Sequence, residues 1–274
     1  MMDGRTPRLR FIIMTVLAAL WALPLAWVLL LSLKPNDVLR QGGLELFLPY
    51  PLTIEHYATL MSVSQTPGWL LNSVMVAGSM TVLTLTLSTL CGYALARIPF
   101  RGQRTLWLFI LAGLMIPSQA VLFPLHELFA RWNLHNTHLA LVAPHLAVPF
   151  GSLLMMQFFQ AVPRELEEAA QLDHAGRFTI FFTIMLPLSR PALTTLAVFT
   201  FLTAWNDFFW PLVSATDTAS YTITVGLSSL QGNFAQSEGL GFIMASAIFA
   251  SVPIVVVYLS FQRHIIRGFA FGGK

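Results

Sequence analysis

The sequence predicts an all-α integral membrane protein with six transmembrane helices surrounded by lipid. Of its 274 residues, 56% are hydrophobic and only 10% are charged, whereas a soluble domain carries about 25% charged residues. Six apolar stretches approach or exceed the length of about 20 residues that a helix needs to cross a bilayer. The basic residues lie at the ends of these stretches and form no aromatic-rich surface, which argues against nucleic-acid binding.

The predicted spans follow one another without an inserted soluble domain. The first contains no charged residue and is too long for the h-region of a signal peptide, so we interpret it as a span. The loop 34–68 is rich in proline and glycine and has a short helical pattern near 54–61. The spans are predicted at 11–33, 69–96, 106–125, 139–162, 191–213 and 240–262.

Lysine and arginine orient these spans, because cytoplasmic loops carry an excess of both. One side of the predicted bundle holds twelve of them and the other side holds three. The twelve are Arg5, Arg8, Arg10, Arg97, Arg101, Arg104, Arg164, Arg177, Arg190, Arg263, Arg267 and Lys274, and the three are Lys34, Arg40 and Arg131. Both termini are therefore expected in the cytoplasm, which agrees with an even number of spans.

The segment 163–190 is the longest interruption of the apolar pattern on the cytoplasmic side. It opens with three glutamates followed by two alanines, namely Glu165, Glu167, Glu168, Ala169 and Ala170. Negative charge is favourable at a helix N-terminus, and the alanines leave room for another surface to approach. From charge alone, a solvated acidic connector between two spans remains an alternative.

The spacing within this segment resembles the EAA loop of type I ABC-importer permeases. The matching residues are Glu168, Ala169, Ala170, Asp173, Ile184, Leu186 and Pro187. In that family the loop is a helix–turn–helix on the cytoplasmic side that docks into a cleft of a partner ATPase. The resemblance therefore implies that these residues, together with His174, form the ATPase-coupling surface, with Asp173 helping to fix the turn.

His174 departs from the family pattern, which usually has glycine at this position. A non-glycine residue at positive φ costs about 1 kcal/mol, and histidine tolerates that conformation better than most residues do. The sequence leaves open whether the neighbouring Gly176 takes over the turn instead.

Other runs narrow the resemblance to the carbohydrate branch, and to the second permease of maltose and glycerol-phosphate type systems. They are WNDFFWPL at 205–212, QRHIIRGFAFGGK at 262–274, Asn72-Ser73, and Gly92-Tyr93-Ala94-Leu95-Ala96-Arg97. On this basis we divide the chain into 1–68 (N-terminal segment, first span and external loop), 69–263 (permease domain) and 264–274 (cytoplasmic tail).

The resemblance implies a subunit that imports a sugar or polyol by alternating access across the cytoplasmic membrane of a prokaryote. Its implied partners are a second permease forming a heterodimer, a dimer of ATP-binding subunits, and an extracytoplasmic solute-binding protein. ATP and Mg²⁺ would be held by the ATPase, and this chain would hold no cofactor. The alternatives are an ABC permease for a peptide, amino acid or anion, and an ion-coupled secondary transporter.

Polar residues within the spans mark a candidate translocation path, because such groups are costly in a membrane and usually face a cavity. Asp207 and His145 are predicted at similar levels near the outer interface, with Asn206 beside Asp207 and Gln119 on the third span. Together these four residues would suit a hydroxylated solute. The alternatives are a solvated interfacial aspartate with ordinary helix kinks, and a proton relay through His145 and Asp207.

No constellation in the sequence predicts catalysis or metal binding. Cys91 is the only cysteine, and His135 and His138 lack a cysteine or carboxylate to complete a zinc site. The stretch 268–274 formally fits the P-loop pattern, but it lacks the serine or threonine and the following helix that a phosphate site needs. We therefore expect a transport subunit and not an enzyme.

Overall fold

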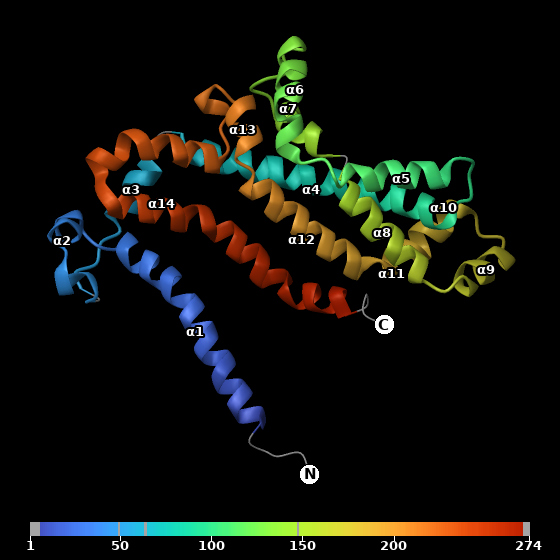
Figure 1. The fold of residues 1–274 in the computed structure, drawn as a ribbon, viewed down its shortest axis with the longest axis horizontal. Helices are drawn as coiled ribbons and strands as arrows, with labels where there is room; N and C mark the ends of the chain where they lie inside the picture. The colour runs from blue at the N-terminus through green and yellow to red at the C-terminus, as the bar shows by residue number, and fades with distance from the viewer. Residues whose placement is uncertain (1–5, 49, 63–64, 147, 271–274) are drawn as a thin grey trace. The chain divides into compact units, whose positions relative to one another are not determined.

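The computed structural model describes residues 6–48, 50–62, 65–146 and 148–270, and every regular element in these ranges is a helix (Figure 1). In chain order they are α1 (Thr6–Ser32), α2 (Asn36–Gln41), η1 (Gly43–Leu46), α3 (Glu55–Ser62), α4 (Thr66–Arg97), α5 (Gln103–Gly113), α6 (Ser118–Arg131), α7 (His138–Val142), η2 (Ala143–His145), α8 (Pro149–Ala161), α9 (Glu165–Leu172), α10 (Arg177–Ile180), η3 (Phe181–Met185), α11 (Leu186–Leu188), α12 (Arg190–Asn206), α13 (Phe209–Ser214), η4 (Thr218–Ser220) and α14 (Ile223–Ala270).

The helices confirm the prediction of an all-α membrane protein. Three of them are long and apolar enough to cross a bilayer alone, over Leu9–Ser32, Thr66–Arg97 and Gly239–Gln262. Three bent pairs pass the same test, so the described residues offer up to six spans. The first predicted span thus corresponds to α1, the second to α4, and the sixth to the part of α14 after a kink at Gly239, where φ is 80°.

The predicted third, fourth and fifth spans are wrong as continuous helices. The third bends by 97° between α5 and α6, and the fourth by 49° between η2 and α8. Proline explains both breaks, because Pro117 and Pro149 disfavour helical geometry in the residue before them and lack an N–H group. The predicted fifth span ends early, because α12 stops at Asn206 and Asp207 is extended, with φ −64° and ψ 128°.

Residues Met1–Pro67 and Gly226–Val252 form one compact unit, and Gly68–Val225 with Pro253–Lys274 form the other. In the first unit, Lys34 is fully buried and its Nζ donates to the carbonyl of Tyr50 at 3.2 Å. His56 contacts the Lys34 carbonyl at 2.8 Å through Nε2, and Ser32 Oγ lies 2.7 Å from the Tyr57 hydroxyl. The described part of the predicted external loop therefore contains α2 and α3, and α3 is tied to the end of α1 by these contacts.

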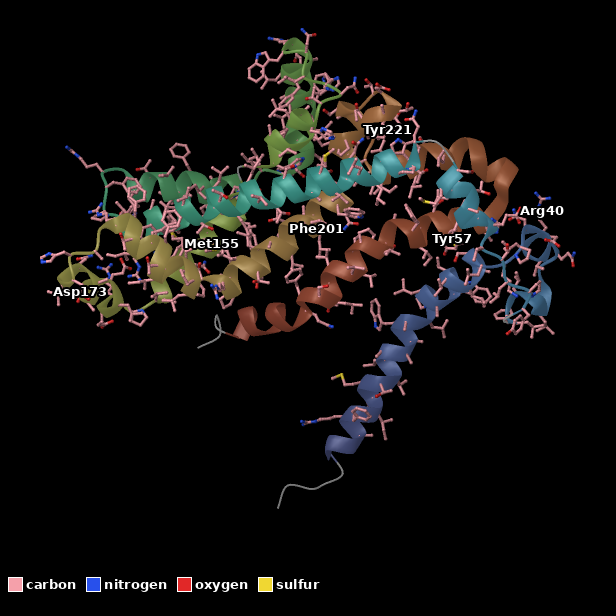
Figure 2. All side chains as sticks on the ribbon, turned by 180° about the vertical axis from the view of Figure 1, so that it is seen from behind. Arg40, Tyr57, Met155, Asp173, Phe201 and Tyr221 are labelled. Atoms are coloured by element: carbon pink, nitrogen blue, oxygen red, sulfur yellow. The ribbon has the colours of Figure 1, made fainter. Side chains whose placement is uncertain are left out.

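The second unit is built around the contact between α4 and α8. A Cβ atom at Gly92 would lie 2.6 Å from Met155 Cβ and 2.7 Å from the Met156 nitrogen, so only glycine allows the two backbones to approach this closely. Figure 2 labels Met155 on α8. A buried cluster surrounds this contact and joins α4, α8, α10, η3 and α12: Tyr93, Met155, Phe159, Ile180, Phe181, Met185, Ala192 and Leu196.

The two ends of the second unit carry different structures (Figure 1). Helices α9, α10 and α11 lie at one end, and α6, α7 and α13 gather away from them. Trp210 holds α13 against α7, because its Nε1 donates to the Ala140 carbonyl at 2.8 Å. Asn72 on α4 donates to the carbonyls of Ala219 and Tyr221 at 2.8 and 3.0 Å and so fixes the chain around η4.

Candidate functional site

The segment 163–190 forms a helix–turn–helix, as the resemblance implied. Helix α9 carries all three glutamates in its first turn, where the helix dipole favours negative charge. A turn at 173–176 leads into α10, and the helix continues through η3 to α11. Asp173, labelled in Figure 2, is the residue at which α9 ends.

His174 itself takes the left-handed conformation that ends α9, with φ 60°. Its N–H donates to the Gln171 carbonyl at 3.0 Å, and the Ala175 N–H donates to the Ala170 carbonyl at 2.9 Å. This pair of bonds is a Schellman motif, the usual way to satisfy the last carbonyls of a helix. The alternative that Gly176 takes over the turn is wrong, because Gly176 is extended with φ −72° and ψ 161°.

Replacing His174 by valine is expected to destabilise this turn by about 1–2 kcal/mol, since a β-branched residue tolerates positive φ poorly. Limited proteolysis of the detergent-solubilised protein would measure the effect as faster cleavage between α9 and α10. The matched control is His174→Gly, which keeps the backbone conformation accessible and should be cleaved no faster than the native chain. Equal cleavage of the valine variant would contradict this account of the turn.

The predicted coupling residues divide into an outward and an inward set. Glu168, Ala169, Asp173, His174 and Pro187 are exposed. Ala170 and Leu186 pack against the buried cluster around Met155, and Ile184 is half-buried. The inward set therefore attaches the loop to the bundle, while the outward set remains available to another protein.

The second helix of the loop widens into a π-helix over Phe181–Met185. Pro187 explains this widening, because it cannot donate to the carbonyl four residues earlier and its ring would clash there. The π-turn keeps Phe181 and Met185 buried in the cluster at 5% and 0% exposure. Pro187 thus changes the geometry of the helical turn that precedes it, in addition to lying near the end of the helix.

Sequence reasoning missed the role of Arg97, which it counted only as a positive charge near the membrane. The Arg97 Nε lies 2.9 Å from Glu167 Oε1, and both side chains are largely buried. The same guanidinium donates to the carbonyls of Phe159 and Val162. The run Gly92–Arg97 was noted for its family pattern, but nothing in the sequence connects Arg97 with Glu167.

The opposite end of the second unit contains a cavity of about 170 Å³. The cavity is lined by Ser118, Gln119, Val121, Leu122, Leu125, Pro144, His145, Asp207, Phe209 and Trp210. Its walls come from α6, η2 and the break between α12 and α13. The volume falls below the roughly 300–1,000 Å³ of most small-molecule pockets.

Three of the four predicted path residues meet at this cavity. His145 Nε2 lies 3.1 Å from Asp207 Oδ2, and Gln119 lines the same space. The helix break at Asp207 turns its carboxylate to His145, while its backbone carbonyl accepts from Thr224 Oγ1 at 3.0 Å. Asn206 is not part of the lining; its Nδ2 donates back to the Leu202 carbonyl at 2.8 Å.

His135, which follows α6, and His138, the first residue of α7, have structural partners. The two ring nitrogens of His135 lie 3.2 Å from the carbonyls of Ser214 and His126. His138 Nε2 lies 3.2 Å from Asn72 Oδ1. Among the residues that the structure describes, no three side chains of the types His, Cys, Asp and Glu group as metal ligands would.

Comparison with known proteins places this architecture in a family. Residues 85–270 match the family model of the binding-protein-dependent transport system inner membrane component. The fold resembles a chain of a bacterial ABC transporter that imports the acidic polysaccharide alginate, with a TM-score of 0.82 at 20% identity. That likeness covers 96% of this chain and 99% of the other.

Curated relatives match over nearly the full length. The arabinooligosaccharides transport system permease protein AraQ of Halalkalibacterium halodurans is 33% identical, over 91% of this chain and 90% of the relative. The trehalose/maltose transport system permease protein MalG of Thermococcus litoralis is 31% identical, over 97% and 96%. The chain therefore belongs to the family of inner membrane components of binding-protein-dependent transport systems, as a multi-pass permease of the ABC-importer type and not an enzyme.

Proposed function

We propose that this chain imports a carbohydrate as a permease subunit driven by a separate ATPase, to which loop 163–190 couples it. The observation that carries the proposal is that α9 packs on the bundle with one face and exposes the other. Its outward face presents Glu168 and Ala169 to solvent, while Ala170 packs against the buried cluster. Exposed apolar side chains flank that face, with Leu172 at 82% and Phe178 at 80% exposure. Such apolar surface beside charges is typical of a docking site.

In this proposal, the end of the second unit that carries loop 163–190 faces the cytoplasm. The end that contains the cavity faces outward. The support is the distribution of lysine and arginine: twelve lie on the side that carries loop 163–190, and three lie on the other side. Both termini are then cytoplasmic. The membrane is the cytoplasmic membrane of a prokaryote.

The working complex contains a second permease, so that the two permeases form a heterodimer. It also contains two ATP-binding subunits, which hold ATP and Mg²⁺, and an external solute-binding protein. The small cavity agrees with a second permease, because a further wall from a partner would bring its volume toward that of most small-molecule pockets. ATP binding would close the ATPase dimer, and α9 would move with the cleft that it occupies.

A carbohydrate is the solute that the polar groups of the cavity suit. A carboxylate, an imidazole and an amide, from Asp207, His145 and Gln119, are hydrogen-bonding partners for hydroxyl groups. Trp210 and Phe209 supply aromatic surface beside them. Two relatives are named for arabinooligosaccharides and for trehalose or maltose, which supports the same class.

Stimulation of ATP hydrolysis tests the proposed solute class. The complex would be purified with its partners and reconstituted, and its binding protein would be offered a panel of oligosaccharides, polyols, peptides, amino acids and inorganic anions. We expect stimulation of hydrolysis by the binding protein with a carbohydrate only. Stimulation by a peptide or an anion, with none by any carbohydrate, would refute the carbohydrate assignment.

Replacing Asp207 by asparagine is expected to slow carbohydrate uptake several-fold, because the variant keeps the side-chain shape but removes the charge next to His145. Asn206→Ala is the matched control, since Asn206 neighbours Asp207 in the chain and does not line the cavity. Uptake into reconstituted vesicles measures both. Equal rates for Asp207→Asn and the native chain, or an equal loss in the control, would remove Asp207 from the path.

A further inference from the structure

Arg97 is the last residue of α4. Its side chain is 5% exposed, and one guanidinium nitrogen donates to the Phe159 carbonyl at 2.6 Å and also to the Val162 carbonyl. These carbonyls belong to the end of α8, where a helix leaves its last carbonyls without partners and carries partial negative charge. Arg97 therefore caps α8 from α4.

The same guanidinium reaches the coupling helix. Its Nε lies 2.9 Å from Glu167 Oε1 in the first turn of α9, and the Glu167 side chain is only 13% exposed. Among the described residues these two atoms have no aligned hydrogen-bond partner, so the contact is one of charge at short range. A single buried cation thus joins the end of α8 to the start of α9.

Apolar packing supports the contacts that Arg97 makes with α8 and α9. Tyr93 lies one turn before Arg97 on α4, and its ring centroid is 5.6 Å from that of Phe159 and 4.9 Å from that of Phe181. At the far end of α9, Ala170 and Ala175 pack against the same buried cluster. Helix α9 is therefore held at both ends, by charge at its start and by apolar packing at its turn.

We propose that Arg97 is a positioning residue that makes α9 move as one body with α4 and α8. Glu167 and Glu168 then have separate tasks, although they are adjacent: Glu167 faces inward to Arg97, and Glu168 faces outward. Only residues 162–164 join α8 to α9, and without the buried pair the start of α9 could shift while packing held only its far end. This inference rests on the proposed function, because it assigns the path by which movement of the ATPase reaches the spans.

Glu167→Gln tests the proposal with the smallest change, since it removes the charge and keeps the size. The reconstituted complex would be assayed for co-purifying ATPase, ATP hydrolysis, and solute transported per ATP hydrolysed. We expect normal assembly, continued hydrolysis and at least a five-fold lower transport ratio. Arg97→Lys is expected to lower the ratio too, because an ammonium lacks the planar fork that serves two carbonyls and a carboxylate together. Glu165→Gln, an exposed change in the same turn, is the matched control and should leave the ratio unchanged.

A second readout does not depend on the solute. Spin labels at Phe150 on α8 and Gln171 on α9, both exposed, would be introduced into a Cys91→Ala background and compared without ATP and with ATP trapped. The distance between the labels should stay constant in the native pair and shift or broaden with ATP in Glu167→Gln. A constant distance in both, a native transport ratio, or loss of the ATPase from Glu167→Gln would overturn the proposal. A complex that hydrolyses ATP but imports no carbohydrate would refute the proposed solute alone, because the label distances would still report on Arg97.

Discussion

Replacing Glu168 by lysine is expected to abolish solute uptake while the chain still folds and enters the membrane. Glu168 is exposed in the first turn of α9. Reversing a charge there costs about 0.3–1 kcal/mol through the helix dipole, which is small against a stability of about 5–15 kcal/mol. At a docked interface, a misplaced charge costs several kcal/mol, and each 1.4 kcal/mol is about a tenfold change. Uptake should therefore fall by about 100-fold or more.

Uptake into vesicles, together with the yield and elution profile of the purified chain, measures both halves of this prediction. The matched control is Glu55→Lys, the same reversal at an exposed position in the first turn of α3, which the orientation argument places outside the cytoplasm. That control should transport normally. Normal uptake in Glu168→Lys would contradict docking through α9.

Replacing Gly92 by leucine is expected to prevent the second unit from folding. Even a single Cβ atom would lie 2.6 Å from Met155 Cβ and 2.7 Å from the Met156 backbone nitrogen. Adding methylenes to a well-packed core costs about 1–3 kcal/mol, and here α4 and α8 would also have to separate. The expected result is loss of monodisperse protein after detergent extraction, or a strongly lowered melting temperature where any protein remains.

Gly78→Leu provides the matched control on the same helix, because nothing lies within 4 Å of a Cβ built at Gly78. The control should be extracted and melt like the native chain. If Gly92→Leu melted at the native temperature, the close approach of α4 and α8 would be contradicted, and with it the cluster that holds the coupling loop.

The sequence predicts the helix–turn–helix of segment 163–190 well because the information is local. The acidic first turn of α9, the turn near His174 and Pro187 all act on residues within one or two helical turns. The one point left open was whether His174 or Gly176 takes the left-handed conformation after α9. That point is also local, because it depends on the φ of a single residue, His174. Apolar length likewise predicted α1, α4 and the last span within a few residues.

Contacts between distant residues were beyond such reasoning. Arg97 and Glu167 are separated by 70 positions, and their burial depends on where α8 ends. Helix kinks were considered only as an alternative, and the spans broken at Pro117, Pro149 and Asp207 were predicted as continuous because hydropathy measures apolar length and ignores helix continuity. Those breaks create the cavity, since the end of α12 turns the Asp207 carboxylate to His145.

Single-cysteine cross-linking from α9 tests the central claim, that this permease couples to a separate ATPase through loop 163–190. Ala169→Cys, in a Cys91→Ala background, would be treated with a short bifunctional reagent in native membranes, with Trp132→Cys at the cavity end as the control. We predict an adduct between Ala169→Cys and a co-purifying ATP-binding subunit whose yield changes with ATP, and none from Trp132→Cys. No ATPase adduct from Ala169→Cys, or an equal adduct from Trp132→Cys, would contradict the account.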